Sequence, residues 1–276
     1  SSPPKEHKVC INLSGGFRNG MEIILTGLDI EEKANVFTNT LFNSVGGKEQ
    51  FDEVSIKLHR TDKDDANTNE EAMASLVISV KSKDPNLVGR LFSAKIIELA
   101  LANIPGFFAQ SGVKTSGPVI VYWPALVKSK YIKEIVHVDG KDIEVEPTSQ
   151  LNLEEIYYQK EPIKLEKIEI KDERELYFGE LFGTRSGDKG GCANLGVWAK
   201  NSRAFAFLYD FLTVDKLKDL LPDLQEFKIE RFELANINSL NFYIHDILQE
   251  GVSSNNRKDG QAKSLGEYLR SKKIKV

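Results

Sequence analysis

Apolar and polar positions in the first part of the chain follow two different periods. Over residues 51–59, Val54, Ile56 and Leu58 alternate with polar residues, which predicts a half-exposed strand. The continuously apolar run at 74–82 predicts a buried strand. Helical spacing predicts helices over 29–44 and 85–104, and short apolar runs predict strands at 8–13 and 117–124. The glycine-rich stretch 14–20 between them predicts a turn-rich loop.

A new pattern starts at residue 173. Alternating Ala193, Leu195, Val197 and Ala199 predict a strand. Further segments predict a strand at 174–183, a helix at 202–211, a helix capped by Thr213, a strand at 226–234 and a helix at 261–272, whereas 239–248 fits strand and helix equally. Two helical segments against about four strands are typical of a ferredoxin-like α+β sandwich.

The stretch 140–172 between these parts is charged and poorly periodic. It predicts a linker that contains at most one short strand pair. We therefore expect three parts: an α/β portion over 1–140, a linker over 141–172, and an α+β sandwich domain over 173–276.

Composition excludes several classes of protein. A net charge of −4 over 276 residues argues against a general nucleic-acid binder. Apolar runs stay far below the ~20 residues of a membrane span, so no membrane partner is expected. Cys10 and Cys192 are distant in sequence and the four histidines are scattered. This pattern predicts free thiols, no metal site and a reducing, cytoplasmic setting.

The segment "TRSGDKGGCANLGVWAK" (184–200) carries the densest polar chemistry of the chain. Arg185 forks onto carboxylates or phosphates, Lys189 is a point charge, and the amides of Gly187 and Gly190 can line an anion site. Ser186 and Asn194 can orient a bound oxygen. The alternative is a structural hairpin turn in which Asp188 binds backbone amides and pairs with Arg185. On the residues alone this alternative is favoured.

A second polar group lies downstream. His245 is a proton-transfer candidate because imidazole titrates near neutral pH, and Asp188 is the other. Asn241 and Asn194 are uncommon choices for strand interiors, which suggests polar contacts beside the same segment.

The motif resembles the C-terminal ferredoxin-fold domain of the acyclic terpene utilisation protein A family. Its loop matches at residues 185–190 and at Asn194, and "NF" at 241–242 with His245 matches a second segment. Asp259 and Lys263 match a third, where Ala262 replaces the family's usual glycine. In the first part, "HKV", "PGF" and "YWP" are similar to the closing part of the family's main α/β domain, so the chain looks like the back half of a longer protein.

The resemblance implies a catabolic enzyme, or a subunit of one, that acts on an anionic branched-chain acid or its acyl-CoA thioester and needs no cofactor. The anion would be held by Arg185, Ser186, Gly187, Lys189, Gly190, Asn194, Asn241, Asp259 and Lys263. Expected partners are this small anionic ligand, the missing N-terminal half or a partner subunit, and further copies in a homo-oligomer. The rival hypothesis is a non-catalytic assembly domain of a larger complex.

Overall fold

The computed structural model describes residues 5–102, 104–145 and 174–276. The described chain divides into two compact units. One is formed by residues 14–121, and the other by residues 122–276 with the start of the chain up to Leu13. The predicted linker lies outside the described residues from 146 onward, so the predicted domain boundary stays a prediction.

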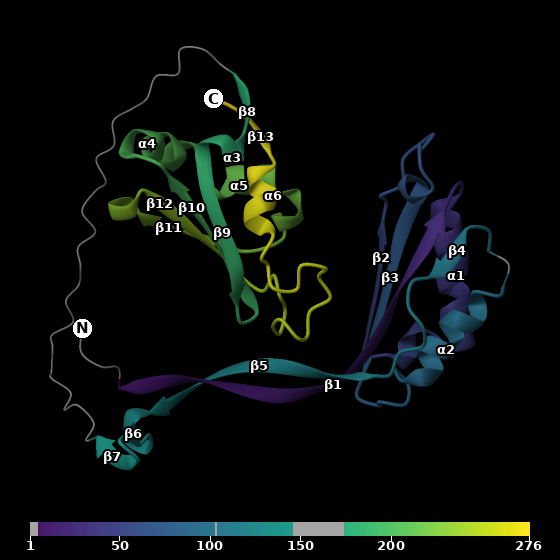
Figure 1. Ribbon diagram of the computed structural model, residues 1–276, viewed down its shortest axis with the longest axis horizontal. Helices are drawn as coiled ribbons and strands as arrows, with labels where there is room; N and C mark the ends of the chain where they lie inside the picture. The colour runs from purple at the N-terminus through teal and green to yellow at the C-terminus, as the bar shows by residue number, and fades with distance from the viewer. Residues whose placement is uncertain (1–4, 103, 146–173) are drawn as a thin grey trace. The chain divides into compact units, whose positions relative to one another are not determined.

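The unit of residues 14–121 is an antiparallel sheet with both helices on one face (Figure 1). Its sheet order is β2-β3-β1-β4, and β5 also pairs with β1. The elements β1 to β4 follow one another as βαββαβ. This element order, together with this sheet order, is the split βαβ arrangement of ferredoxin-like folds. The elements are β1 (Glu6–Thr26), α1 (Ile30–Ser44), β2 (Glu53–His59), β3 (Met73–Ser82), α2 (Arg90–Leu99), β4 (Phe107–Ala109) and β5 (Gly117–Lys128).

The core of this unit lies between the sheet and the two helices. Ile23 of β1 and Ile78 of β3 are fully buried against Phe37 of α1 and Ile96 of α2. The predicted loop at 14–20 is wrong, because β1 runs through it. Its glycines instead allow the backbones of β1 and β3 to lie close together. A Cβ on Gly20 would lie 2.6 Å from the carbonyl oxygen of Ile78.

The second unit contains a four-stranded antiparallel sheet of order β11-β12-β10-β9. Helices α4 and α5 connect β10 to β11, two strands that run in the same direction on either side of β12. The elements are β6 (Glu134–Val138), β7 (Lys141–Val145), β8 (Glu175–Tyr177), α3 (Phe178–Leu181), β9 (Phe182–Lys189), β10 (Cys192–Ala199), α4 (Ser202–Phe211), α5 (Val214–Leu220), β11 (Ile229–Leu234), β12 (Ser239–Ile244), α6 (Leu265–Arg270) and β13 (Lys273–Lys275).

This order is a circularly permuted ferredoxin-like sheet. In the usual order the edge strand beside β10 would follow α6, whereas here that place belongs to β9, which comes first in the chain. The predicted α+β sandwich is therefore confirmed, and 239–244 proves to be a strand. The predicted cap of α5 is also confirmed, since Thr213 Oγ1 accepts a hydrogen bond from the Lys216 N–H at 3.1 Å.

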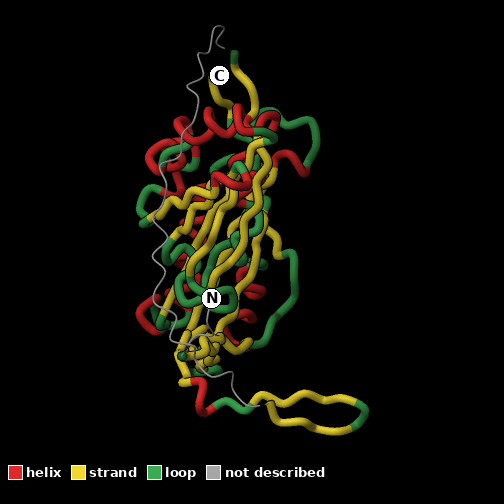
Figure 2. The backbone as a smooth tube through the Cα atoms, turned by 90° about the vertical axis from the view of Figure 1, so that its left-hand side faces the viewer, coloured by secondary structure: helices red, strands yellow, loops and turns green. Residues whose placement is uncertain are grey.

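One face of the second sheet is covered and the other is open. The covered face buries Leu195, Val197, Leu240 and Phe242 against α4, α5 and α6. Two further strand pairs lie outside this sheet, β8 with β13 and β6 with β7. Figure 2 shows β6 and β7 as a simple two-stranded hairpin, and every one of their residues is exposed.

Candidate functional site

The RSGDKGG segment is an edge strand followed by a tight turn. Residues up to Lys189 belong to β9, and Lys189 pairs with Cys192 of β10. Only Gly190 and Gly191 form the turn. Gly190 has φ +67° and Gly191 has no positive φ, the pattern of a type II′ hairpin turn. The hairpin turn that the residues alone favour is therefore present, although without the Arg185–Asp188 pair, and residues 185–189 form a strand and not an open anion-binding loop.

Strand alternation separates the predicted site residues onto the two faces of the sheet. Successive side chains point to opposite faces, so Arg185 and Gly187 lie on the open face while Ser186 and Asp188 lie on the helix side. Through the cross-strand register, Asn194 and Asn241 share the open face with Arg185. An Arg185–Asp188 ion pair is thus ruled out by direction, and none occurs among the described residues.

The open face holds an amide–amide pair and a histidine–carboxylate pair. Asn194 Nδ2 donates to Asn241 Oδ1 at 3.2 Å. His245 Nε2 lies 2.8 Å from Glu230 Oε1. The hydrogen bond from His245, together with one from Lys228, holds the pKa of the Glu230 carboxyl below its usual range. The Arg185 side chain is exposed, and within the described ranges it joins no carboxylate.

On the helix side the predicted residues anchor α6. Ser186 Oγ accepts a hydrogen bond from the Gly266 N–H at 3.0 Å. The Asp259 carboxylate accepts bonds from the Lys263 N–H, the Ser264 N–H and the Ser264 hydroxyl. Burial acts to raise the pKa of Asp259, but the bonds from Ser264 and Lys263 outweigh it and the pKa is lowered. These hydrogen bonds indicate that Ser186 and Asp259 stabilise α6 and the segment that precedes it.

The cationic side chains of Lys189 and Lys263 stay at the surface. Lys189 Nζ donates to the backbone carbonyl of Asp188 at 2.8 Å, and Lys263 is exposed. The predicted anion-binding residues therefore do not converge on one point.

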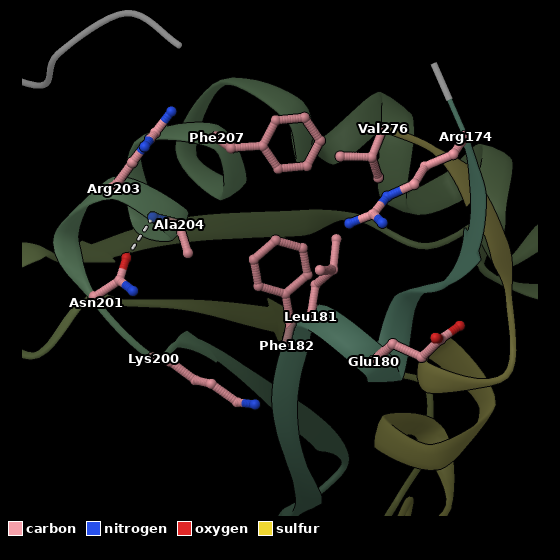
Figure 3. A pocket seen from close by; sticks show the side chains of 10 residues that line it. All are labelled: Arg174, Glu180, Leu181, Phe182, Lys200, Asn201, Arg203, Ala204, Phe207 and Val276. Atoms are coloured by element: carbon pink, nitrogen blue, oxygen red, sulfur yellow. Dashed lines mark hydrogen bonds between the residues drawn. The ribbon is translucent and has the colours of Figure 1, made fainter. Parts of the chain in front are cut away.

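A hollow of about 460 Å³ lies at the opposite end of β10 from the hairpin turn. Its floor is apolar and partly aromatic: the Phe182 and Phe207 rings lie parallel with their centroids 6.1 Å apart. Leu181, Ala204 and Val276 complete the apolar lining (Figure 3). Ligand pockets span about 300–1,000 Å³ and are mostly apolar with a few polar groups, so this hollow has the size and character of one.

The polar groups around the hollow are mainly cations. Arg174 reaches toward the apolar side chains from one side, while Lys200 and Arg203 stand on the side of α4 (Figure 3). In the described part of the chain, none of the three forms an ion pair with a carboxylate. The Glu180 carboxylate, the one acidic side chain in the lining, accepts a hydrogen bond from the Tyr177 N–H at 2.7 Å.

The N-terminus of α4 opens at the same hollow. Asn201 Oδ1 caps it by accepting a hydrogen bond from the Ala204 N–H at 2.9 Å. A helix N-terminus carries a partial positive charge, which adds to the positive potential of Lys200 and Arg203. The arrangement suits an amphipathic anion, with its apolar part on Phe182 and Phe207 and its charge among these cations.

Sequence reasoning missed every residue of this pocket. Arg174, Lys200 and Arg203 come from separate segments that β8, β10 and α4 bring together. The run Lys200 to Arg203, at the point where a strand leads into a capped helix, was the local signal of a positive helix start.

Over residues 5–102, 104–145 and 174–276, no three His, Cys, Asp or Glu side chains gather in a way that suits a metal ion. None of the described helices has the length and apolar character needed to cross a membrane.

Comparison with known proteins gives two matches to family models. Residues 1–138 match the acyclic terpene utilisation family protein AtuA, and residues 178–275 match the AtuA ferredoxin-like domain. No curated protein and no solved structure matches the chain. The second match spans α3 to β13 and so contains all four strands of the permuted sheet described above, β9 to β12. The chain belongs to the acyclic terpene utilisation protein AtuA family.

Proposed function

We propose that the chain is a catabolic enzyme, or an enzyme subunit, that binds an anionic branched-chain acid or its acyl-CoA thioester in the pocket between α3 and α4. The observation that carries this proposal is the apolar hollow of about 460 Å³ bordered by Arg174, Lys200 and Arg203. Membership of a family implicated in acyclic terpene utilisation supports a branched aliphatic ligand.

The two forms of the ligand place different demands on the cations. A free acid presents a carboxylate close to its chain, which suits Arg174 because its guanidinium points toward the apolar side chains (Figure 3). A CoA thioester has no carboxylate at that point, and its phosphates extend away from the acyl chain. Lys200 and Arg203 at the α4 side are the groups suited to those phosphates.

Calorimetric titration with citronellate tests the proposal directly. Citronellol is the matched neutral ligand, and acetate is the matched anion without the chain. Arg174→Met keeps the aliphatic stem and removes the charge. A hydrogen bond to a charged group is worth roughly 1.5–3 kcal/mol, so this change should weaken citronellate about tenfold or more and leave citronellol unaffected.

Citronellyl-CoA separates the thioester from the acid. If the thioester is the ligand, Arg203→Met weakens it more than Arg174→Met does. Arg90→Met, at an exposed position of α2, is the matched control. If Arg185→Lys weakens binding while both pocket variants leave it intact, the ligand binds on the open face of the sheet. This result would overturn the pocket assignment. Absence of binding by every probe would favour an assembly domain.

A further inference from the structure

The positive groups of the pocket stand at two places, on either side of its apolar floor. Arg174 lies on one side, and Lys200 and Arg203 lie on the other, at the start of α4 (Figure 3). The side chains between these two places are apolar, with Phe182 and Phe207 at the centre (Figure 3). A ligand that compensates both places must therefore carry negative charge at both ends of an apolar chain.

The apolar floor is part of a row of packed phenyl rings. Phe207 lies against Phe211 with ring centroids 5.1 Å apart, and Phe182 lies against Phe178 with centroids 4.9 Å apart. Phe178 and Phe182 are buried. Because packing fixes these rings, an apolar surface separates the two places of positive charge before any ligand binds.

The described residues of the lining carry more positive than negative charge. Three cations stand against one carboxylate, that of Glu180, which leaves a net charge of +2. Glu180 lies on the same side of the pocket as Arg174 (Figure 3), but its carboxylate is already bound by the Tyr177 N–H at the start of α3. A ligand with a single carboxylate compensates only part of the positive charge, whereas a dianion matches it.

The start of α4 favours an anion for a separate reason. A helix N-terminus attracts negative charge and disfavours cations, yet Arg203 is the second residue of α4 and Lys200 directly precedes its cap, Asn201. The first turn of α4, all of which is described, contains no acidic residue, whereas that of α5 contains Asp215. An anion bound here would lie between two cations and the positive end of the helix, and it would relieve their mutual repulsion.

We propose that the pocket binds a branched acyclic chain that carries an anionic group at each end. One carboxylate binds Arg174, the chain lies on Phe182 and Phe207, and the second anionic group lies between Lys200 and Arg203. This inference rests on the proposed function and narrows its ligand to one that is charged at both ends. Two kinds of molecule have this chemistry, a branched α,ω-dicarboxylic acid and the mono-CoA thioester of such a diacid.

Calorimetric titration with ligands of one carbon skeleton tests both the number and the position of the charges. Dihydrocitronellate has one carboxylate, and in its α,ω-diacid a second carboxylate replaces one terminal methyl group. A malonate that bears the same branched chain has both carboxylates at one end. For the thioester arm, the mono-CoA thioester of the diacid is compared with dihydrocitronellyl-CoA.

We expect the ligand charged at both ends to bind about fivefold or more tightly than its counterpart charged at one end. This factor is modest because the three cations are exposed, and ion pairs at exposed groups contribute less than buried ones. The diacid should also bind more tightly than the malonate, which has the same charge.

Two variants assign the ends of the ligand. Arg203→Met should weaken the diacid about fivefold and leave dihydrocitronellate nearly unchanged, whereas Arg174→Met should weaken both. Arg90→Met, at an exposed position of α2, is the control and should change neither. Circular dichroism of each variant establishes that it is folded before affinities are compared.

The possible outcomes separate this inference from the proposed function. If dihydrocitronellate binds and Arg174→Met weakens it, but neither doubly charged ligand exceeds its counterpart, the proposed function stands and this inference is overturned. A malonate that binds as tightly as the diacid would overturn it as well, because charge placement would then have no effect. A gain for the diacid alone identifies the dicarboxylate, and a gain for the thioester alone identifies the CoA form. Failure of every ligand to bind would overturn the proposed function and this inference together.

Discussion

Ser186 Oγ accepts a hydrogen bond from the Gly266 backbone N–H at 3.0 Å, which ties the edge strand β9 to the first turn of α6. Gly266 is confined at this point, because a Cβ on it would lie 2.7 Å from Thr184 Oγ1. The serine of the RSGDKGG motif thus joins two elements that are 80 residues apart in sequence.

Ser186→Ala should therefore lower the free energy of unfolding by about 1 kcal/mol, the usual net value of a hydrogen bond inside a protein. Urea denaturation measures this change, with Ser253→Ala at an exposed position as the control. Binding of citronellate should be unaffected. A variant as stable as the parent that loses ligand affinity would show that Ser186 contacts the ligand.

Gly183 and Gly187 lie on the same face of β9, but only Gly183 is covered. A Cβ at Gly183 would collide with the Trp198 ring, whereas a Cβ at Gly187 meets nothing within 4 Å. Gly183→Ala should displace Trp198 and cost about 1–3 kcal/mol of stability, as overpacking does. Gly187→Ala should be neutral or slightly stabilising. Tryptophan emission in a Trp123→Phe background reports the ring, and equal spectra for the two variants would contradict the prediction.

The Asp259 carboxylate should contribute stability that depends on pH. Because its pKa in the folded chain is lowered, the contribution is present above the usual Asp value of about 3.9 and is lost as the pH falls through the folded pKa. Asp259→Asn should therefore be less stable than the parent at pH 7, and the difference should shrink toward about pH 3. Asp210→Asn, at an exposed position of α4, is the control and should show a smaller difference at pH 7.

Tyr243 should give the opposite dependence at alkaline pH. A hydrogen bond to Cys192, together with burial, raises the pKa of Tyr243 to about 12, so the unfolded chain releases this proton at lower pH than the folded chain does. Stability should fall as the pH rises from about 10 toward 12, and Tyr243→Phe should remove this part of the decline. Urea unfolding at successive alkaline pH values measures it. Parallel curves for parent and variant would show that the Cys192 hydrogen bond is not maintained in solution.

The sequence pattern predicts those helices and strands in which apolar and polar residues recur with a single period. The alternation at Ala193, Leu195 and Val197 gave β10, and Thr213 marked the start of α5. The glycine-rich segment 14–20 was wrongly predicted to be a loop, because glycine permits close strand contact as well as turns. In the RSGDKGG segment the favoured hairpin turn is present at Gly190 and Gly191, while residues 185–189 extend the strand before it. Whether Gly20 opposes a carbonyl oxygen depends on its partner strand, which local sequence does not specify.

The candidate site was harder to predict for a related reason. Arg185, Asn194 and Asn241 share a face through strand register, and the alternation of β10 was enough to suggest the last two. The pocket joins Arg174, Phe207 and Val276, which are distant in sequence. The sequence around Arg174, which precedes the three-residue strand β8, does not indicate that it lies beside Phe207 and Val276, so only the folded structure shows it.

The pairing of β8 with β13 also has a mechanical consequence. Arg174 and Val276 exchange both backbone hydrogen bonds, at 2.8 and 2.9 Å, at one end of this short ladder. Tension between these two points would open the ladder like a zipper, one pair at a time, before the four-stranded sheet bears any load. Arg174 and Val276 also line the pocket, so a force that separates β8 from β13 would disrupt the pocket. An acid bound in the pocket would in turn oppose the separation of β8 from β13.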